Sequence, residues 1–419
     1  MAIDRSGIPN KSQLISFGAA WIGWVMDAFD FTVFLLVMPH IEKEFGVKHT
    51  ASTGAIALTL LMRLVGGFIA GKAADKWGRK LPLLVSVVWF AVCDGAIAMA
   101  PSFMAIIVLR TLFGLGMGAE WTSGTTLAME NWPAKTKGIA SGVLQGSWAV
   151  GYLLAAVASA IIVPRFGWRA LFVVTAMPAL LVLPLRAWVP ESKEWKNAVK
   201  KAGGDLGLLQ LFKKNTGLLG RTIWGCFAMS AGFGAYYAIT GLYPTMLKLE
   251  HAQDERGIAI LVAIFNVGMM IGSVVCGTIA AKKSVTLALA LPAALSVFAL
   301  PFYVGHVEGH MSIGAFLGGA FGAGFSGVTP MLLTSMFPAE GRARLVGIVY
   351  HVGAFFAGFV PLFTASLSQT LHWSLGKSIL VVSGVLEIAL VILVLGGRKR
   401  SVRDTSEDTE TPSPALDAQ

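Results

Sequence analysis

The sequence predicts an all-α integral membrane protein of about twelve transmembrane helices, arranged in two pseudo-symmetric bundles of six. Of its 419 residues, 55% are hydrophobic and 13% are charged, whereas a soluble protein carries about 25% charged residues. Apolar runs long enough to cross a bilayer, roughly 20 residues each, recur along nearly the whole chain. A polar segment at 189–220, rich in Lys and Gly, divides these runs into two sets.

The first six runs precede this polar segment, and we expect them at 14–38, 52–71, 81–100, 103–127, 139–163 and 169–188. The other six follow it, at 221–246, 257–281, 283–304, 311–336, 345–369 and 375–396. Several runs contain Gly or Pro, which membrane helices tolerate better than soluble ones.

The runs and the polar segment predict four regions. We expect an N-terminal bundle over 1–188, a cytosolic central loop over 189–220 and a C-terminal bundle over 221–397. The remaining stretch, 398–419, is acidic and rich in Ser, Thr and Pro, which predicts a disordered cytosolic tail.

The positions of Lys and Arg predict the orientation, because cytosolic loops carry an excess of both. With the N-terminus in the cytosol, 24 of the 33 Lys and Arg residues fall in inner segments and 7 in outer segments. Arg186 is counted with the inner set, and Arg63 and Arg110 lie inside apolar runs. We therefore expect a multi-pass protein of a bacterial inner membrane with both termini in the cytosol. The net charge of +10 follows from this topology and does not indicate nucleic-acid binding.

A charged turn at 71–80 lies between the second and third runs and reads G-x-x-x-D-x-x-G-R-K. This pattern resembles the loop between the second and third helices of major facilitator superfamily transporters. Arg110 with Gly114, Gly116 and Gly118 is similar to the fourth-helix pattern of that superfamily. The resemblance implies two bundles that rock about a central cavity. It also implies a salt-bridge latch at the cytosolic face, formed by Asp75, Arg79 and Glu130.

Within the superfamily, the segments at 24–31 and 118–121 resemble proton-coupled organic-acid carriers, in particular the sialate:proton symporters and the lactate permeases. The segments at 141–146 and 242–247 resemble the lactate permeases more specifically. Two features depart from these groups. The His and Asp that lactate permeases carry before Leu-Tyr-Pro are missing at 237–241, and the extra central helices of some sialate carriers are absent.

Charged residues inside the apolar runs are the strongest functional candidates, because each costs about 2.5–3.5 kcal/mol unless it is paired or hydrated. They are Asp27, Asp30, Arg63, Asp94, Arg110, Glu120 and Glu387. All except Glu387 lie in the N-terminal half, so we expect the proton chemistry there and mostly neutral contacts from the C-terminal half.

Asp27 and Asp30 are three residues apart and share a helix face near the middle of the membrane. Two neighbouring carboxyl groups in a medium of low dielectric constant favour binding of a proton. Arg110 can hold one of them ionised, or bind a substrate carboxylate through two hydrogen bonds. We expect Asp27, Asp30, Arg110 and Glu120 to take part in proton coupling. The alternative is that these residues form fixed structural ion pairs.

The other intramembrane charges have less specific interpretations. Arg63 and Asp94 can pair with each other or with Asp27, and for Glu387 we favour a structural or lipid-interface role. His351 can accept a proton, but we favour a buried neutral histidine.

Neutral candidates for substrate contact come from three helices, since a cavity for a small acid needs few polar groups on apolar walls. They are Gln145, Trp148, Tyr236, Tyr237, Tyr243 and Asn266. Each of the tyrosines has packing as its alternative role.

The function that fits these features is proton-coupled symport of a small organic acid anion, such as lactate, pyruvate or sialic acid, by alternating access. We expect the anion, protons and membrane lipid as partners, no nucleic acid, and a monomer. The sequence carries no phosphate-binding loop, metal-ligand cluster or nucleophile constellation, so we expect neither an enzyme nor a cofactor or metal; the proton is the coupling ion.

Two other functions compete with symport. One is a proton-antiporting exporter of drugs or metabolites with the same fold. Exporters of that kind carry a Gly-x-x-x-Gly-Pro run in the fifth helix, whereas residues 142–148 contain no proline. The other is a membrane receptor or channel that transports nothing by alternating access.

Overall fold

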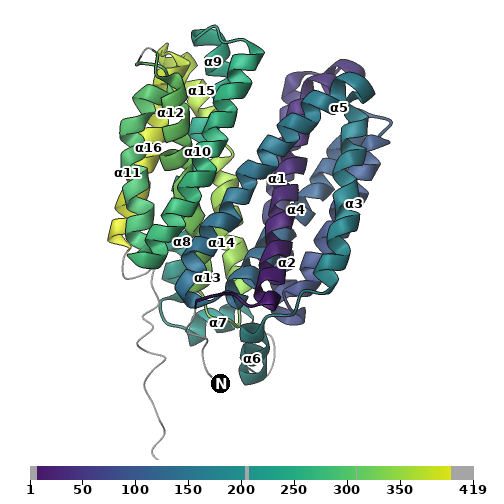
Figure 1. Cartoon of the computed structure of the whole chain (residues 1–419), viewed down its shortest axis with the longest axis vertical. Helices are drawn as coiled ribbons and strands as arrows, with labels where there is room; N and C mark the ends of the chain where they lie inside the picture. The colour runs from purple at the N-terminus through teal and green to yellow at the C-terminus, as the bar shows by residue number, and fades with distance from the viewer. Residues whose placement is uncertain (1–6, 203–206, 308, 398–419) are drawn as a thin grey trace, which may run out of the picture.

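Two groups of long helices stand side by side along the long axis of the molecule (Figure 1). The structure is a computed structural model, and it describes residues 7–202, 207–307 and 309–397. Helices α1 to α5 form the N-terminal bundle, and helices α8 to α16 form the C-terminal bundle. The short helices α6 (Lys193–Ala202) and α7 (Leu208–Lys214) lie between the bundles at one end (Figure 1). The predicted tail at 398–419 lies outside the described residues.

The N-terminal bundle follows the predicted runs closely. Its helices are α1 (Lys11–Phe45), α2 (His49–Trp77), α3 (Lys80–Ala98), α4 (Phe103–Asn131) and α5 (Lys137–Ala187). Asn10 begins α1 with a capping box, because its side chain accepts from the backbone N–H of Gln13 at 2.9 Å and its own N–H donates to the Gln13 side chain at 2.8 Å. The 51 residues of α5 include a break at Gly167, whose φ of 77° favours glycine. This break separates the fifth and sixth predicted spans.

The C-terminal bundle is less regular. Its helices are α8 (Leu218–Thr240), α9 (Tyr243–Glu250), α10 (Glu255–Lys282), α11 (Val285–Tyr303), α12 (Met311–Leu317), α13 (Thr329–Met336), α14 (Arg342–Ala357), α15 (Val360–Leu371) and α16 (Leu375–Gly396). A π-helical turn η2 (Gly318–Ala323) and a 3-10 turn η3 (Gly324–Val328) join α12 to α13. The tenth predicted run, 311–336, is therefore one membrane crossing with an irregular middle.

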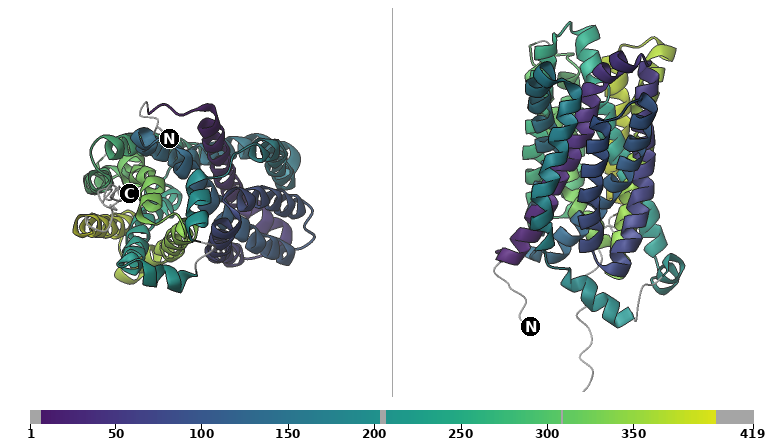
Figure 2. Two further views of the ribbon diagram at one scale, coloured as in Figure 1. Left: turned by 90° about the horizontal axis from the view of Figure 1, so that it is seen from below. Right: turned by 90° about the vertical axis from the view of Figure 1, so that its right-hand side faces the viewer.

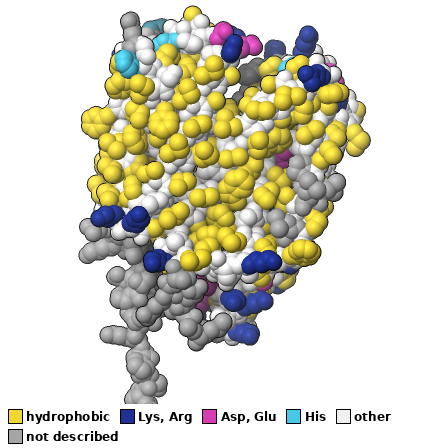
Figure 3. All heavy atoms as spheres, in the orientation of Figure 1, with side chains coloured by type: hydrophobic (Ala, Val, Ile, Leu, Met, Phe, Trp, Pro, Cys, Tyr) yellow, Lys and Arg dark blue, Asp and Glu magenta, His cyan; other side chains and the backbone are white. Residues whose placement is uncertain are grey.

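The helices account for the predicted membrane crossings. Within the described residues, 10 helical stretches are long and apolar enough to cross a bilayer. One of them, α5, holds two predicted spans, and α8 supplies the remaining one. Hydrophobic side chains cover the face between the two ends of the molecule, whereas Lys and Arg gather at those ends (Figure 3). The chain is therefore an all-helical, multi-pass membrane protein.

The two bundles meet along two seams, α5 against α10 and α2 against α14. Figure 2 shows the bundles from one end, with these helices between them. At the first seam, Gly138 of α5 lies against Gly277 of α10 so closely that a Cβ on either would collide with the backbone of the other. Small residues at such a contact let helix backbones approach each other. The seams place the side chains of the N-terminal bundle directly opposite those of the C-terminal bundle.

Candidate functional site

A cavity lies between the bundles at about mid-height, with a volume of about 730 Å³ that includes open solvent. Its N-terminal wall comes from Trp24, Arg63, Gln145 and Trp148. Its C-terminal wall is mostly apolar and aromatic and includes Met229, Phe233, Tyr236, Tyr237, Met269, Leu289, Phe325, Ser326, Thr329, Leu332, Tyr350 and Leu390.

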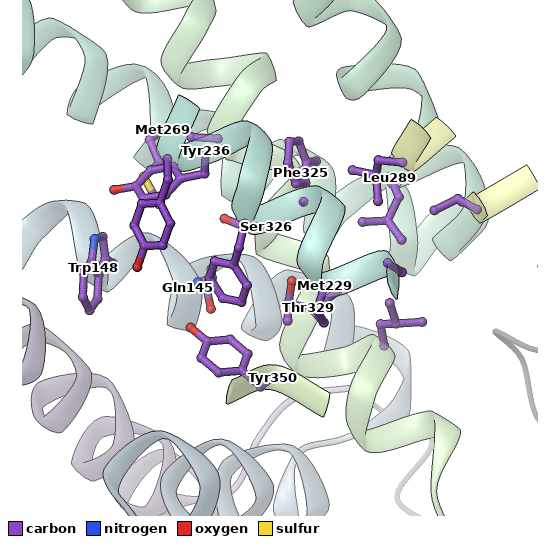
Figure 4. A pocket seen from close by; sticks show the side chains of 18 of the residues that line it. Gln145, Trp148, Met229, Tyr236, Met269, Leu289, Phe325, Ser326, Thr329 and Tyr350 are labelled. Carbon is purple, nitrogen blue, oxygen red and sulfur yellow. The ribbon is translucent and has the colours of Figure 1, made fainter. Parts of the chain in front are cut away.

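Polar atoms point into this cavity from both sides. Figure 4 shows the hydroxyl group of Tyr350, from α14, directed toward Gln145, from α5. The Oε1 atom of Gln145 is buried and has no hydrogen-bond partner among the described residues. Tyr236, on the C-terminal wall, lies next to Trp148, on the N-terminal wall. The predicted contacts Gln145, Trp148, Tyr236 and Tyr237 therefore share one cavity, together with Trp24 and Tyr350, which the sequence did not single out.

Arg63 is the charged residue on the cavity wall. The centre of its guanidinium group lies 5.5 Å from the ring of Trp24, 6.0 Å from that of Trp148 and 5.6 Å from that of Tyr350. Aromatic faces attract a cation without using its N–H donors. Its Nε and Nη2 atoms are buried and make no hydrogen bond to the described residues. The aromatic rings thus hold the guanidinium in place without using its N–H donors.

Asp27 of α1 lies behind Arg63. Its Oδ2 atom is 3.9 Å from the Nη2 atom of Arg63, which is longer than the roughly 2.7–2.9 Å of a charge-assisted hydrogen bond. The side chain is fully buried, and neither oxygen has a hydrogen-bond donor among the described residues. The two groups form a loose ion pair that can separate without breaking a hydrogen bond.

Asp30 has Asp94 of α3 and Arg110 of α4 as its main charged neighbours. The carboxyl oxygens of Asp30 and Asp94 lack a well-formed hydrogen bond to the described residues, and Thr175 of α5 lies beside Asp94. Asp30 and Asp94 lie close enough to bond to each other if one of them holds a proton. The guanidinium of Arg110 lies 4.4 Å from the ring of Phe34 and 4.3 Å from that of Phe113. Arg110 is not among the residues that line this cavity, and its expected contact with a substrate stays a prediction.

Glu120 is held by an ion-pair partner that the sequence did not indicate. Arg186, near the end of α5, donates through Nη1 to Glu120 Oε2 at 2.8 Å and through Nη2 to Oε1. Ser86 of α3 donates to the same carboxylate at 2.6 Å. Gly23 of α1 makes room for this pair, because a Cβ there would overlap both side chains. Arg186, which the sequence analysis counts with the inner set, is fully buried in the structure.

Three further candidates lie away from the cavity wall. The side-chain amide of Asn266 donates to the carbonyl of Val262 on its own helix at 2.9 Å. Tyr243 stacks on Tyr303 with 4.0 Å between ring centroids. Glu387 is 0% exposed, so the expected lipid-interface position is wrong.

His351 of α14 lies buried at the seam between the bundles. Its Nε2 atom is 3.2 Å from the hydroxyl of Thr122 and 3.2 Å from the carbonyl oxygen of Gly118, both on α4. This contact crosses from the C-terminal to the N-terminal bundle. His351 is therefore a seam residue, and it does not line the cavity.

The predicted latch residues come together at one end of the molecule, which we call the latch end. Arg79 donates to Asp75 at 3.0 Å and to both oxygens of Glu130 at 3.2 and 3.0 Å. Burial lowers the pKa of Arg79, but Glu130 and Asp75 outweigh burial and leave that pKa above its ordinary value. Arg79 is thus a fixed cation between two acids.

The latch also joins the two bundles. Asp75 accepts hydrogen bonds from the backbone N–H groups of Ala343 and Arg344 at 3.2 and 3.1 Å, in the first turn of α14, where the helix dipole favours a carboxylate. Arg79 donates to the carbonyl of Ala339 at 3.0 Å, and Arg342 donates to Glu130 at 3.0 Å. Each of these four contacts crosses from one bundle to the other.

The central segment strengthens the latch, which the sequence did not indicate. Glu191 accepts from the backbone N–H groups of Arg79 and Lys80 at 3.0 and 3.1 Å. Trp195 of α6 donates through its indole N–H to the carbonyl of Asp75 at 2.7 Å, and Glu194 pairs with Arg342. The segment after α5 therefore braces the turn that carries Asp75 and Arg79.

Comparisons with known proteins agree with this architecture. Residues 20–313 match a family model described as Major Facilitator Superfamily. The chain is 29% identical over 393 residues to the sialic acid transporter NanX of Escherichia coli (strain K12), covering 92% of this chain and 94% of that protein. It is 26% identical over 373 residues to the cis,cis-muconate transport protein of Acinetobacter baylyi, covering 85% and 88%.

Among solved structures, the proton:xylose symporter XylE bound to 6-bromo-6-deoxy-D-glucose superposes with a TM-score of 0.75. The match covers 92% of this chain and 95% of that chain at 19% sequence identity. At this identity the likeness supports the two-bundle fold and carries no information on the substrate.

Proposed function

The chain belongs to the Major Facilitator Superfamily, and on that premise we propose that it is a proton-coupled symporter that takes up a small organic acid anion by alternating access. The observation that carries this proposal is Arg63, held by aromatic rings on the cavity wall with unpaired donors and with Asp27 behind it. In this assignment Arg63 takes the role of anion ligand that the sequence gave to Arg110.

Arg63 supplies the recognition of the anion. A guanidinium binds a carboxylate through two parallel hydrogen bonds, which fixes the orientation of the ligand as well as its affinity. The body of the ligand then lies against Trp148, Tyr236, Tyr237 and Tyr350. Such a wall suits an acid with an apolar or planar body, and hydroxyl groups on the ligand have Gln145 as a partner.

The substrates named for several relatives are organic acids, which agrees with the proposed class of substrate. Besides sialic acid and muconate, the curated proteins similar to this chain include a niacin transporter of Acinetobacter baylyi, which is 29% identical over 171 residues. These names describe several acids of different shape, so we propose the class of carboxylate and take lactate, pyruvate and sialic acid, with muconate and nicotinate, as the compounds to test.

In the proposed cycle, Asp27 is the residue that binds the coupled proton. With Asp27 ionised, the Asp27–Arg63 pair is neutral, and an incoming anion would leave a net negative charge buried at mid-membrane, which is unfavourable. A proton on Asp27 cancels this charge and releases Arg63 to the anion. Binding of the anion and of the proton therefore favour each other, which is the condition for symport.

The latch indicates which end of the molecule is closed and therefore which side of the membrane the cavity faces. We assign the latch end to the cytosol, since the excess of Lys and Arg predicts this side, which places the N-terminus and the central segment in the cytosol. The bundles contact each other through the latch and diverge toward the opposite end (Figure 1), where Figure 3 shows a notch between them. In this assignment the structure represents the outward-facing state of a monomer in the bacterial inner membrane.

The test is uptake of labelled lactate, pyruvate, sialic acid, muconate and nicotinate into proteoliposomes, with and without an inward proton gradient. We expect one of these acids to accumulate only when the gradient is present. Asp27→Asn should abolish accumulation above the outside concentration while retaining exchange of internal for external substrate, because the neutral amide imitates the protonated acid.

Three outcomes would contradict the proposal. Accumulation that ignores the gradient in the wild-type protein would exclude proton coupling. Gradient-driven accumulation that survives in Asp27→Asn would move the proton to another residue. Substrate efflux driven by an inward proton gradient would favour the exporter.

A further inference from the structure

A second buried acid lies in the C-terminal bundle, away from Asp27 and Arg63. Glu387 is near the middle of α16 and is 0% exposed. At about 1.5 Å per residue, it lies roughly 15 Å from either end of that helix, which is close to mid-membrane. An ionised side chain at this depth costs about 2.5–3.5 kcal/mol unless it is paired.

Among the residues that the structure describes, Glu387 has no such partner. The charged residues of the neighbouring elements lie at helix ends: Arg221 on α8, Lys248 and Glu250 on α9, and Lys377 on α16 itself. The sequences of α11, α12, η2, η3, α13 and α15 contain no Asp, Glu, Lys, Arg or His. The titratable groups of the packed helices are Cys226, Tyr236 and Tyr237 on α8, Tyr243 on α9 and Tyr303 on α11, whose hydroxyl donates to the carbonyl of Ile239. Burial without an ionic partner favours the neutral form of a carboxyl group over the charged form.

Two buried serine side chains form a small polar site with this acid. Ser296 of α11 lies beside the Glu387 carboxyl group, and Ser383 stands one turn earlier on α16. Both serine hydroxyls and both carboxyl oxygens lack a well-formed hydrogen bond to the described residues. A Cβ on Gly322 would lie 2.8 Å from Ser296 Oγ and 3.3 Å from Glu387 Oε1, so both oxygens converge on the bare Cα of that glycine.

The position of this site connects it to the substrate cavity. Leu390, three residues after Glu387 on α16, and Ala323, next to Gly322, both line the cavity. Gly322 itself belongs to the π-helical turn η2, and such turns are frequent at functional sites, where the helical hydrogen-bond ladder is interrupted. A rearrangement of η2 between the outward-facing and inward-facing states would uncover Glu387 to the cavity.

We propose that Glu387, with Ser296 and Ser383, forms a second proton-binding site, which is loaded in this state and releases its proton during transport. The proposal rests on the proposed symport, since it adds a further proton to the same cycle. It differs from a purely structural role in one measurable way, because a structural carboxyl group keeps its proton throughout.

The test is the number of protons moved per substrate by the full-length chain in proteoliposomes, measured from the substrate gradient that balances an imposed membrane potential and pH gradient. Glu387→Gln, which imitates the protonated acid, should still transport but move one proton fewer per substrate. Glu255→Gln, at an exposed acid in the first turn of α10, is the matched control and should keep the wild-type ratio.

The outcomes separate the two proposals. A wild-type protein that moves substrate without protons overturns the symport itself. A wild-type protein that moves protons, with the same ratio in Glu387→Gln, overturns the role of Glu387 alone. If Glu387→Gln does not fold, Glu387→Asp withdraws the acid from Ser296: a shifted pH dependence of uptake supports the second site, and an unshifted one overturns it.

Discussion

The N-terminal and C-terminal bundles divide the chemistry of the cavity unequally. The N-terminal bundle buries Asp27, Asp30, Arg63, Asp94 and Arg110 around mid-height. Among the described residues of the C-terminal bundle, Glu387 is the buried acid at that depth, and the wall it presents to the cavity is aromatic and aliphatic. One bundle carries the charges, and the other provides surfaces against which a ligand body packs.

The same division recurs at the latch end. The N-terminal bundle contributes the side chains of Asp75, Arg79 and Glu130. The C-terminal bundle contributes the N–H groups of residues 343 and 344, the carbonyl of Ala339, and the side chains of Arg342 and Arg344, which pair with Glu130 and Asp75. Backbone groups and arginine side chains keep their charge at all ordinary pH values, so the carboxyl groups that can take up protons lie on the N-terminal side of each contact. Such an arrangement lets one bundle sense ligands while the other moves as a rigid counterpart.

The largest expected effect tests which charge of the N-terminal bundle meets the substrate. Arg63→Lys keeps the charge but loses the planar fork, and hydrogen bonds to charged groups contribute about 1.5–3 kcal/mol. We expect the substrate dissociation constant to rise by roughly 10- to 100-fold. Binding to the purified protein, followed by quenching of intrinsic tryptophan fluorescence, measures this directly because Trp24 and Trp148 line the cavity.

Arg110→Lys is the matched control for that experiment. Arg110 is as deeply buried as Arg63 but lies between Phe34 and Phe113, off the cavity wall. Its substitution should slow transport because it disturbs the neighbouring acids Asp30 and Asp94. The substrate dissociation constant should stay within about threefold of wild type, a smaller change than the loss of a hydrogen bond to a charged group would cause. A larger loss of affinity in Arg110→Lys than in Arg63→Lys would reverse the assignment of the anion ligand.

The sequence predicted the order and depth of the helices well, because bilayer thickness sets their length. The expected run at 103–127 corresponds to α4 (Phe103–Asn131), and the run at 375–396 corresponds to α16 (Leu375–Gly396). It predicted only some of the side chains that face the cavity: Gln145, Trp148, Tyr236 and Tyr237 line it, whereas Arg110, Tyr243 and Asn266 do not. Membrane helices are apolar on most sides, so their rotation about their own axes leaves little trace in the pattern of residues.

The sequence was equally unable to show which of the intramembrane charges pair with each other. Arg63 and Arg110 were both intramembrane arginines, and only the packing of α2 and α4 places one on the cavity wall and the other behind it. Arg186 stands near the end of a run, where arginine commonly extends to the membrane surface, yet it turns inward to Glu120. Asp75 and Arg79 were accessible to sequence because they share one short turn, whereas their partners at 339–344 are more than 200 residues away.

A second, smaller effect tests the division at the latch end. Asp75→Asn keeps the size of the side chain but removes the negative charge that accepts from Arg79, Ala343 and Arg344. We expect the equilibrium to shift away from the latched state by about 1–3 kcal/mol, the usual range of conformational coupling. Turnover should fall while substrate binding persists, measured as transport rate and dissociation constant on the same preparation.

Glu340→Gln provides the comparison, since this partly exposed acid lies in the loop beside Ala339 without taking part in the four contacts described above. It should leave both quantities close to wild type. If Asp75→Asn instead left turnover unchanged and weakened substrate affinity, the latch would have to be assigned a direct role in binding.

The smallest expected effect tests whether neutral contacts also come from the N-terminal bundle. Gln145 lines the cavity with an unpaired Oε1, whereas Asn266 of the C-terminal bundle bonds to its own helix. Replacing a single neutral hydrogen-bonding group costs about 0.5–1.5 kcal/mol, so Gln145→Leu should raise the dissociation constant roughly 2- to 10-fold. Asn266→Leu, of similar size, should leave it unchanged. The reverse result would mean that α10 turns toward the substrate once it binds, and that the C-terminal bundle contributes polar recognition in another state of the cycle.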